Sequence, residues 1–388
     1  MAMRPAPLVD DLMREIFLRL PPDDPRGLIR AAAACRIWRG ILSDPAFASE
    51  YRALHGAPPM LGFLYDERYT DDWPFHGDYW VSHFVSTASF RSPACEDRQH
   101  WRVLDSRHGL VLFYTPTLDA QFLVCDLVAG DQWEIHADPK CYSIMWWEHD
   151  EAKHKYASIH CNAAVLCAND PCDHLHCHGG PFRVALVGSV EDGSVAHATV
   201  YSSETGEWSD ISSVQNPNYI NGRGHSAVVG NKVYVPCLES DSVVEYNMGE
   251  QQLSEIDAPF EDQDQNQPYI ELMGVEDGML LFASVVDARL YLWSMEAGPS
   301  GTAGWARRWV IELEPLLPPD AVSDKPDDVL PVGFAEGVSV IFLGTRNGMY
   351  TIDLNSGKCE KVHQICFEKV MPYMSFYTGA WGQLLTLE

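Results

Sequence analysis

The sequence predicts a small all-α domain of three helices followed by an all-β propeller of about six blades, with five to seven as the range. Two observations lead to this fold class. Apolar side chains near the N-terminus recur with the period of an amphipathic helix. After residue 60, short apolar runs alternate with glycine turns at near-equal intervals, as in an all-β repeat. We therefore predict a helical domain over residues 1–56 and a propeller over residues 57–388.

The first predicted helix begins near residue 8. An apolar residue recurs at every fourth position, at Leu8, Leu12, Ile16 and Leu20. Asp10 or Asp11 is expected to cap its start by accepting backbone N–H bonds. Pro21 and Pro22 end it, because proline lacks the N–H donor that a helix interior needs.

Two more helices complete the predicted domain. The second runs from Pro25 to about Leu42, and the third starts at Ser43 or Asp44 with Pro45 in its first turn. So short a chain buries only about 60% of the surface it exposes when unfolded. The apolar stripe of the first helix is wider than one face requires, and surplus apolar surface favours a partner site. The alternative is that every one of these residues belongs to the local core.

Paired glycines mark the predicted blades. Their members lie 21, 18, 19, 20 and 20 residues apart, in the pairs Gly109/Gly130, Gly188/Gly206, Gly230/Gly249, Gly278/Gly298 and Gly337/Gly357. The first glycine of each pair is expected in a turn beside an apolar strand. Each repeat spans roughly 40–60 residues, which is the length of a four-stranded blade rather than of a helical solenoid unit.

One further blade fits between Met60 and about Val103. A C-terminal strand over Gln383–Leu387 is expected to pair with this blade and close the ring, which removes the unpaired strand edges. The alternative architecture is two stacked β-sandwich domains, which would not require the regular interval.

Charge and cysteine usage bound the function. The net charge is −28, while residues 1–56 carry +1, so the body is strongly acidic and we expect no nucleic-acid partner. No run of eighteen apolar residues occurs, and we expect no membrane partner. The eleven cysteines lack C-x-x-C pairs, and several lie in apolar strand-like runs. That usage is typical of free thiols in a reducing compartment and predicts a cytoplasmic or nuclear location, or both.

Two groups of residues are candidates for chemistry or recognition. Soft thiolates and imidazoles, which are zinc ligands, gather at Cys172, His174, His176, Cys177 and His178. Their spacing matches no standard zinc template, so a polar loop between blades is the preferred interpretation and a metal site the alternative. Trp146 and Trp147 lie beside charged residues and are candidates for contact with a protein target, with blade packing as the alternative.

Sequence motifs of the common enzyme classes are absent. The chain has no G-x-S-x-G, no H-E-x-x-H, no G-x-x-x-x-G-K and no G-x-G-x-x-G that opens a helix. We therefore predict no catalytic residues and no cofactor, and a role in binding rather than in catalysis.

The segment from Leu8 to Phe47 resembles an F-box, with its apolar helix, a Leu-Pro-Pro stop, Cys35-x-x-Trp38 and Ser43-x-Pro45-x-Phe47. Val9 stands where that family usually has proline, and Ala34 replaces a larger aliphatic residue. The resemblance implies docking to a Skp-family adaptor. The residues expected to make that contact are Leu8, Val9, Leu12, Ile16, Leu20, Pro21 and Trp38.

The body is similar to the kelch-like, F-box-associated propeller of a large plant family, notably over residues 201–208, 290–294, 332–337 and 372–377. The two resemblances together imply a substrate-receptor subunit of an SCF-type cullin-RING ubiquitin ligase. Its F-box would bind the adaptor, and through it a cullin, while its propeller recruits a protein target for ubiquitination. The alternative is a propeller that binds a small ligand or carbohydrate, or serves as a scaffold, without driving degradation.

Overall fold

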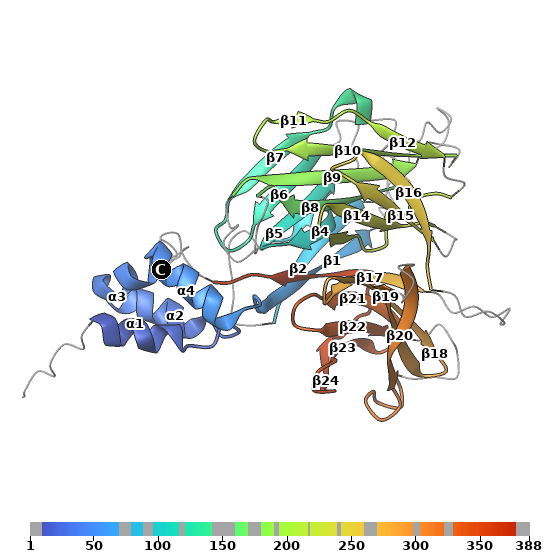
Figure 1. The fold of residues 1–388 in the computed structure, drawn as a ribbon. Helices are drawn as coiled ribbons and strands as arrows, with labels where there is room; N and C mark the ends of the chain where they lie inside the picture. Colours follow the sequence, from blue (N-terminus) through green and yellow to red (C-terminus); the bar gives the residue numbers. More distant parts are fainter. Residues whose placement is uncertain are drawn as a thin grey trace, which may run out of the picture.

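A computed structural model of the chain describes residues 10–69, 79–87, 96–115, 121–141, 160–169, 180–189, 194–215, 218–238, 242–259, 270–297, 303–321 and 329–377. Four helices precede the strands: α1 (Asp10–Leu18), α2 (Arg26–Ala34), α3 (Arg36–Leu42) and α4 (Pro45–His55). Figure 1 shows these helices (blue) gathered on one side of the β-sheets. We call them the helical domain.

The helical domain has four helices where the sequence predicted three. The predicted second helix is interrupted at Cys35, whose backbone is extended (φ −159°, ψ 159°). The Cys35 sulfur accepts the Trp38 backbone N–H at 3.5 Å, which caps the new helix. The Arg39 side chain donates to the Ala32 carbonyl at 3.1 Å and so satisfies the end of the preceding helix. Each helix end created by the break therefore gains one local hydrogen bond from a side chain.

The strands form six sheets, which confirms the predicted six-bladed propeller. The first blade contains β4 (Arg102–Arg107), β5 (Leu110–Thr115), β6 (Gln121–Asp126) and β7 (Gln132–His136), followed by the short 3-10 helix η2 (Pro139–Cys141). The second contains β8 (Cys161–Cys167), β9 (Phe182–Ser189), β10 (Val195–Ser202), β11 (Glu207–Trp208) and β12 (Ser212–Gln215). The third contains β13 (Ala227–Val229), β14 (Lys232–Pro236), β15 (Ser242–Asn247) and β16 (Gln252–Asp257).

The remaining three blades follow the same plan. The fourth contains β17 (Glu271–Glu276), β18 (Met279–Val286), β19 (Arg289–Ala297) and β20 (Ala303–Glu312). The fifth contains β21 (Val329–Ala335), β22 (Val340–Thr345), β23 (Gly348–Asp353) and β24 (Cys359–His363). The sixth contains β25 (Val370–Met374), β1 (Met60–Tyr69), β2 (Tyr79–Ser86) and β3 (Arg98–Gln99). The alternative of two stacked β-sandwiches is therefore wrong.

Ring closure uses a different strand from the one predicted. β25 pairs antiparallel with β1, placing Leu64 opposite Met371, and so joins the end of the propeller to its beginning. The predicted closing strand, Gln383–Leu387, lies outside the described residues. Closure in this way leaves one side of β1 paired with β25 and the other with β2, so neither edge of that strand is open.

Tight hairpins explain the first glycine of two of the predicted pairs, Gly109 and Gly278. His108 and Gly109, between β4 and β5, both have positive φ (54° and 78°), as do Asp277 and Gly278 between β17 and β18 (52° and 76°). Two successive positive φ values are the mark of the type I′ turn, which glycine accepts without strain. The predicted turn at Gly188 is wrong, because Gly188 lies inside β9 and pairs with Cys161 and His197.

Candidate functional site

Helix α1 leaves part of its apolar surface uncovered. Met13 and Phe17 are buried, whereas Leu12 is 50% and Ile16 is 43% exposed. Leu12 and Ile16 are one helical turn apart and so share a face of the helix. The surplus apolar surface expected from the sequence is therefore present at these two residues.

The other predicted adaptor contacts have mixed positions. Trp38 and Leu20 are half-buried, and Trp38 packs edge-on against Phe17 with ring centroids 5.7 Å apart. Pro21 is exposed. Leu8 and Val9 lie outside the described residues.

Sequence reasoning missed two exposed apolar side chains of the helical domain. Ile37, on α3, and Leu54, on α4, are both largely exposed. Ile37 directly precedes Trp38, but the prediction of one continuous helix over this region gave no reason to place it at the surface. Each of the three helices α1, α3 and α4 thus presents an apolar side chain to solvent.

Polar contacts fix α1 against α4. The Arg14 guanidinium, on α1, donates to the Glu50 carboxylate at 2.6 Å and lies 5.6 Å from the centre of the Phe47 ring. The Tyr51 hydroxyl donates to the Leu20 carbonyl at 2.8 Å, and the His55 ring contacts the Leu18 carbonyl at 2.9 Å. These bonds satisfy carbonyls at the end of α1, which would otherwise lack partners. The exposed face of α1 is consequently presented by a fixed helix.

The helical domain and the propeller share one hydrophobic core. Phe47 and Tyr51 belong to the same buried cluster as Phe113 and Tyr373 of the propeller. The Tyr51 ring meets the Phe376 ring edge-on, with centroids 6.2 Å apart. A core that spans both parts holds them in one orientation, and Figure 1 shows α4 next to the end of the sixth blade. A partner bound to the helices therefore has a defined position relative to the propeller.

A buried ion-pair network joins five of the blades; we call it the axial network. The Arg107 guanidinium, at the end of β4, donates to both Glu336 oxygens at 2.9 and 3.0 Å and to the Ser226 carbonyl at 2.6 Å. Asp105 pairs with Arg107 at 3.1 Å and accepts the Val165 backbone N–H of β8 at 2.9 Å. Glu336 also accepts the backbone N–H of Val275, on β17, at 3.0 Å. Residues from five separate blades are tied together at this point.

Arg107 stays charged within the axial network. Burial alone would lower the pKa of Arg107, but Asp105 and Glu336 raise it above its ordinary value. The guanidinium is therefore permanently charged, and four of its five N–H bonds are donated to Asp105, Glu336 and Ser226. These bonds join separate blades, so Arg107 serves mainly to hold the propeller together.

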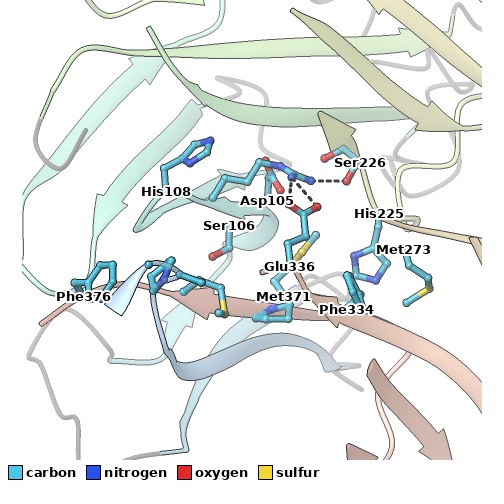
Figure 2. Close-up of a pocket in the computed structure, with 16 residues that line it drawn as sticks. Asp105, Ser106, His108, His225, Ser226, Met273, Phe334, Glu336, Met371 and Phe376 are labelled. Atoms are coloured by element: carbon cyan, nitrogen blue, oxygen red, sulfur yellow. Dashed lines mark hydrogen bonds and ion pairs between the residues drawn. The ribbon is translucent and has the colours of Figure 1, made fainter. Parts of the chain in front are cut away.

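The axial network forms one wall of a cavity of about 320 Å³, which we call the proximal cavity because Gly56, Ala57 and Pro58, next to the helical domain, line it. Figure 2 shows Asp105, Ser226 and Glu336 pointing toward one another, with Phe334, Met371 and Phe376 along another side. His225 also lines it; burial lowers its pKa to about 3, so this imidazole is neutral at pH 7. The cavity combines an apolar border with a polar wall whose groups already have partners.

A second cavity of about 300 Å³ lies toward the other end of β4, and we call it the distal cavity. Its lining comes from β1, from the start of β4 and from the segment just before β25, and includes Trp80, Arg102, Arg223 and Lys369. Two cavities of this size, one beside the helices and one away from them, are near the lower end of the range for small-molecule sites.

The remaining candidates from the sequence lie outside the described residues. Trp146 and Trp147 do so, and so do all five members of the Cys172–His178 group. Within the ranges that the structure describes, no three His, Cys, Asp or Glu side chains come together in a way that could hold a metal. Burial raises the pKa of the Cys125 and Cys141 thiols to about 11, which keeps the nucleophilic thiolate scarce at pH 7. None of the described helices has both the length and the apolar character to cross a bilayer.

Comparisons with known proteins add the following. No protein-family model and no curated protein matches the sequence. Among solved structures, a chain of the nidogen–laminin complex is similar with 11% identity and a TM-score of 0.41, covering 81% of this chain and 99% of that one. The β-propeller domain of the Trilobed protease from Pyrococcus furiosus is similar with 8% identity and a TM-score of 0.36, covering 77% and 91%. A protein from Lactobacillus plantarum is similar with 11% identity and a TM-score of 0.36, covering 80% of this chain and 99% of that one. Similarity at this level carries no argument about function.

Proposed function

We propose that this chain is the substrate-receptor subunit of an SCF-type cullin-RING ubiquitin ligase. Its helical domain docks a Skp-family adaptor, and through that adaptor a cullin, while its propeller recruits a protein target for ubiquitination. The observation that carries the proposal is the exposed pair Leu12 and Ile16 on a helix whose opposite face is locked into the core. An apolar patch of this kind on a fixed element is a typical protein-docking surface.

The shared core of the helical domain and propeller supports the same role. A receptor works by holding its target at a fixed place near the transferring enzyme, so it supplies proximity rather than chemistry. A rigid link between the two binding parts serves that purpose, and here Tyr51 and Phe376 pack across the junction. In this proposal the chain is not itself an enzyme and acts in the cytoplasm or nucleus.

Co-purification with a Skp-family adaptor tests the proposal. We compare the wild type with the double variant Leu12→Asp/Ile16→Asp. About half of each side chain is open to a partner, so lost apolar burial and the cost of desolvating two carboxylates together remove about 3 kcal/mol. That corresponds to roughly a hundredfold weaker complex.

A matched control comes from the propeller. Val310 on β20 is 47% exposed, much like the two test residues, and Val310→Asp should leave adaptor binding unchanged. Thermal unfolding of each variant verifies that it is folded. Wild-type protein that fails to retain the adaptor, or a double variant that binds it as tightly, contradicts the proposal.

The second candidate function is a propeller that binds a small ligand or carbohydrate, or acts as a scaffold, without driving degradation. The two cavities favour it, because each could enclose a small molecule. Removal of the receptor from cells separates the two functions. The abundance of the bound protein rises if the receptor drives degradation and stays constant if it does not.

A further inference from the structure

The distal cavity concentrates positive charge in an otherwise strongly acidic protein. Arg68, Arg102, Arg223 and Lys369 all line it, although the chain carries a net charge of −28. Three carboxylates, on Asp66, Glu67 and Glu368, line it as well. Which charges remain available to a ligand depends on how these groups pair.

The acidic groups are already engaged. Asp66 accepts hydrogen bonds from the Ser82 hydroxyl and from the Val103 backbone N–H. Glu67 accepts the Tyr69 hydroxyl at 2.8 Å. Glu368 lies at the rim, where it accepts a hydrogen bond from Arg223 at 3.4 Å. The carboxylates therefore neutralise part of the cavity's charge and are held by neighbours.

Arg102 is different: it forms an ion pair with Asp66, but its buried Nε–H has no hydrogen-bond acceptor. The residue is only 7% exposed, and its guanidinium lies 4.4 Å from the centre of the Trp80 ring. Its Nε is 3.5 Å from the nearer Asp66 oxygen and has no hydrogen-bond partner. Across the described ranges of the chain, no group accepts a hydrogen bond from this guanidinium. A buried arginine with unused donors normally signals a missing acceptor.

Lys369 adds a second partly unused cation. Its Nζ donates to the Gly224 carbonyl at 2.9 Å and to the Leu104 carbonyl at 3.2 Å. An ammonium group has three N–H bonds, so one remains. Burial first, and then the positive charge of Arg102, lower the pKa of Lys369 to about 8. Lys369 is thus charged at pH 7, close enough to Arg102 for the two charges to repel.

We propose that the distal cavity binds one carboxylate or phosphate group, held by the guanidinium of Arg102 and the ammonium of Lys369. The planar fork of an arginine matches two oxygens of such a group, and lysine adds a point charge. An anion here supplies the acceptors that Arg102 lacks and relieves its repulsion with Lys369. The part of this proposal that concerns a protein target rests on the proposed function, whereas anion binding itself does not depend on the adaptor.

The rim of the cavity fits an apolar neighbour of the anionic group. Ile365 is 57% exposed, and with Trp80 and Phe367 it lines the same cavity. Two sources offer the required chemistry: an acidic or phosphorylated segment of a protein target, and a free small anion. The apolar rim provides a means of distinguishing them, because only a larger ligand reaches it.

Calorimetric titration of the full chain with sulfate at pH 7 and low ionic strength tests the site. Sulfate is the probe because it presents several oxygens and its charge does not change near neutral pH. We expect one binding event, weakened at least tenfold in Arg102→Gln. The matched control is Arg289→Gln, which removes the same charge from an exposed position on β19 paired with Glu312. It should leave sulfate binding unchanged.

A second variant covers the case in which Arg102→Gln does not fold. Arg102→Lys keeps a positive charge near Asp66 but loses the two-pronged geometry, so we expect partial loss of sulfate binding. Wild-type protein that binds no sulfate overturns the proposal. Equal binding by the wild type and a folded Arg102 variant also overturns it.

A peptide distinguishes the two sources. The probe is a five-residue peptide with phosphoserine between two leucines, and its unphosphorylated form is the control. Tighter binding of the phosphopeptide than of sulfate, sensitive to Arg102→Gln, indicates a protein segment. Binding no tighter than sulfate indicates a free small anion. The Leu12→Asp/Ile16→Asp variant should bind sulfate normally, so failure of adaptor docking and failure of this site are observed separately.

Discussion

Removal of the Glu336 carboxylate should destabilise the propeller more than removal of an equivalent surface carboxylate. Glu336 accepts two hydrogen bonds from Arg107 and one from the Val275 backbone. In Glu336→Ala these three donors lose their acceptor. The Arg107 side chain is only 10% exposed, so water cannot freely replace the lost partner.

The magnitude follows from burial. Breaking a buried ion pair by removing one partner costs about 3–5 kcal/mol. Glu336 itself is 35% exposed, and Asp105 still pairs with Arg107, so we expect a smaller loss, about 2–3 kcal/mol. At an unfolding entropy of about 2.1 cal/mol/K per residue, this lowers the melting temperature of a 388-residue chain by about 3 °C.

The assay is thermal and urea unfolding of three proteins side by side: wild type, Glu336→Ala and Glu312→Ala. Glu312 pairs with Arg289 at 2.8 Å, but both side chains are about half exposed, so its removal should cost less than about 1 kcal/mol. Equal losses in the two variants would refute the reasoning that burial of the axial network determines its contribution.

Three further predictions concern other parts of the fold. Because the buried His225 has a pKa of about 3, protonation is taken up mainly by the unfolded state, and stability falls as pH drops below about 6.5. Between pH 6.5 and 4.5, His225→Gln should lose about 2 kcal/mol less unfolding free energy than the wild type, measured by urea unfolding; identical pH profiles would contradict this. A side chain at Gly333 would meet the Val370 carbonyl at 2.5 Å, whereas Gly304 has open space. Gly333→Ala should therefore destabilise by about 1–3 kcal/mol and Gly304→Ala should not, and similar melting temperatures would exclude the clash. Phe47→Ala should cost about 3–5 kcal/mol, because the ring is fully buried in the shared core; a loss under 1 kcal/mol would show that the helical domain repacks.

The approximate number of blades was predictable because hairpin turns between neighbouring strands leave a mark in the local sequence. The hairpin at His108 and Gly109 and the hairpin at Asp277 and Gly278 form between strands adjacent in sequence. The position of each hairpin depends on local backbone geometry, which the residue types largely determine. The prediction failed where that signal was ambiguous, at Gly188, which lies within a strand paired on both sides.

The helical domain was predicted in outline and missed in one detail. The period of α1 follows from a spacing of four residues, but that spacing does not tell which apolar side chains face solvent. The packed helices decide this: Met13 and Phe17 are buried, whereas Leu12 and Ile16 are exposed. The break at Cys35 does not, because no proline or glycine marks it. It depends on contacts such as the Arg39 bond to the Ala32 carbonyl, which form only when the helices pack.

The closing strand and both cavities depend on contacts between distant residues. β1 pairs with β25 across some three hundred residues, and no local pattern in Gln383–Leu387 or Val370–Met374 determines which strand reaches it. Arg107 and Glu336 are 229 positions apart, and Lys369 is 265 positions from Leu104. Arg107, Glu336 and Lys369 each look like an ordinary surface charge in the sequence.

The sequence by itself predicted the class of the two parts, a blade number of about six within a range of five to seven, and the apolar stripe of α1, because periodicity and turn chemistry act over a few residues. The structure fixed the number at six. Only the tertiary structure decided how the ring closes, how the helical domain joins the propeller and which charged groups keep unused donors. The physical reason is that burial and pairing are properties of all the segments that meet at one point. Arg102 acquires its unmet donors only after Trp80, Asp66 and Lys369 have been brought around it.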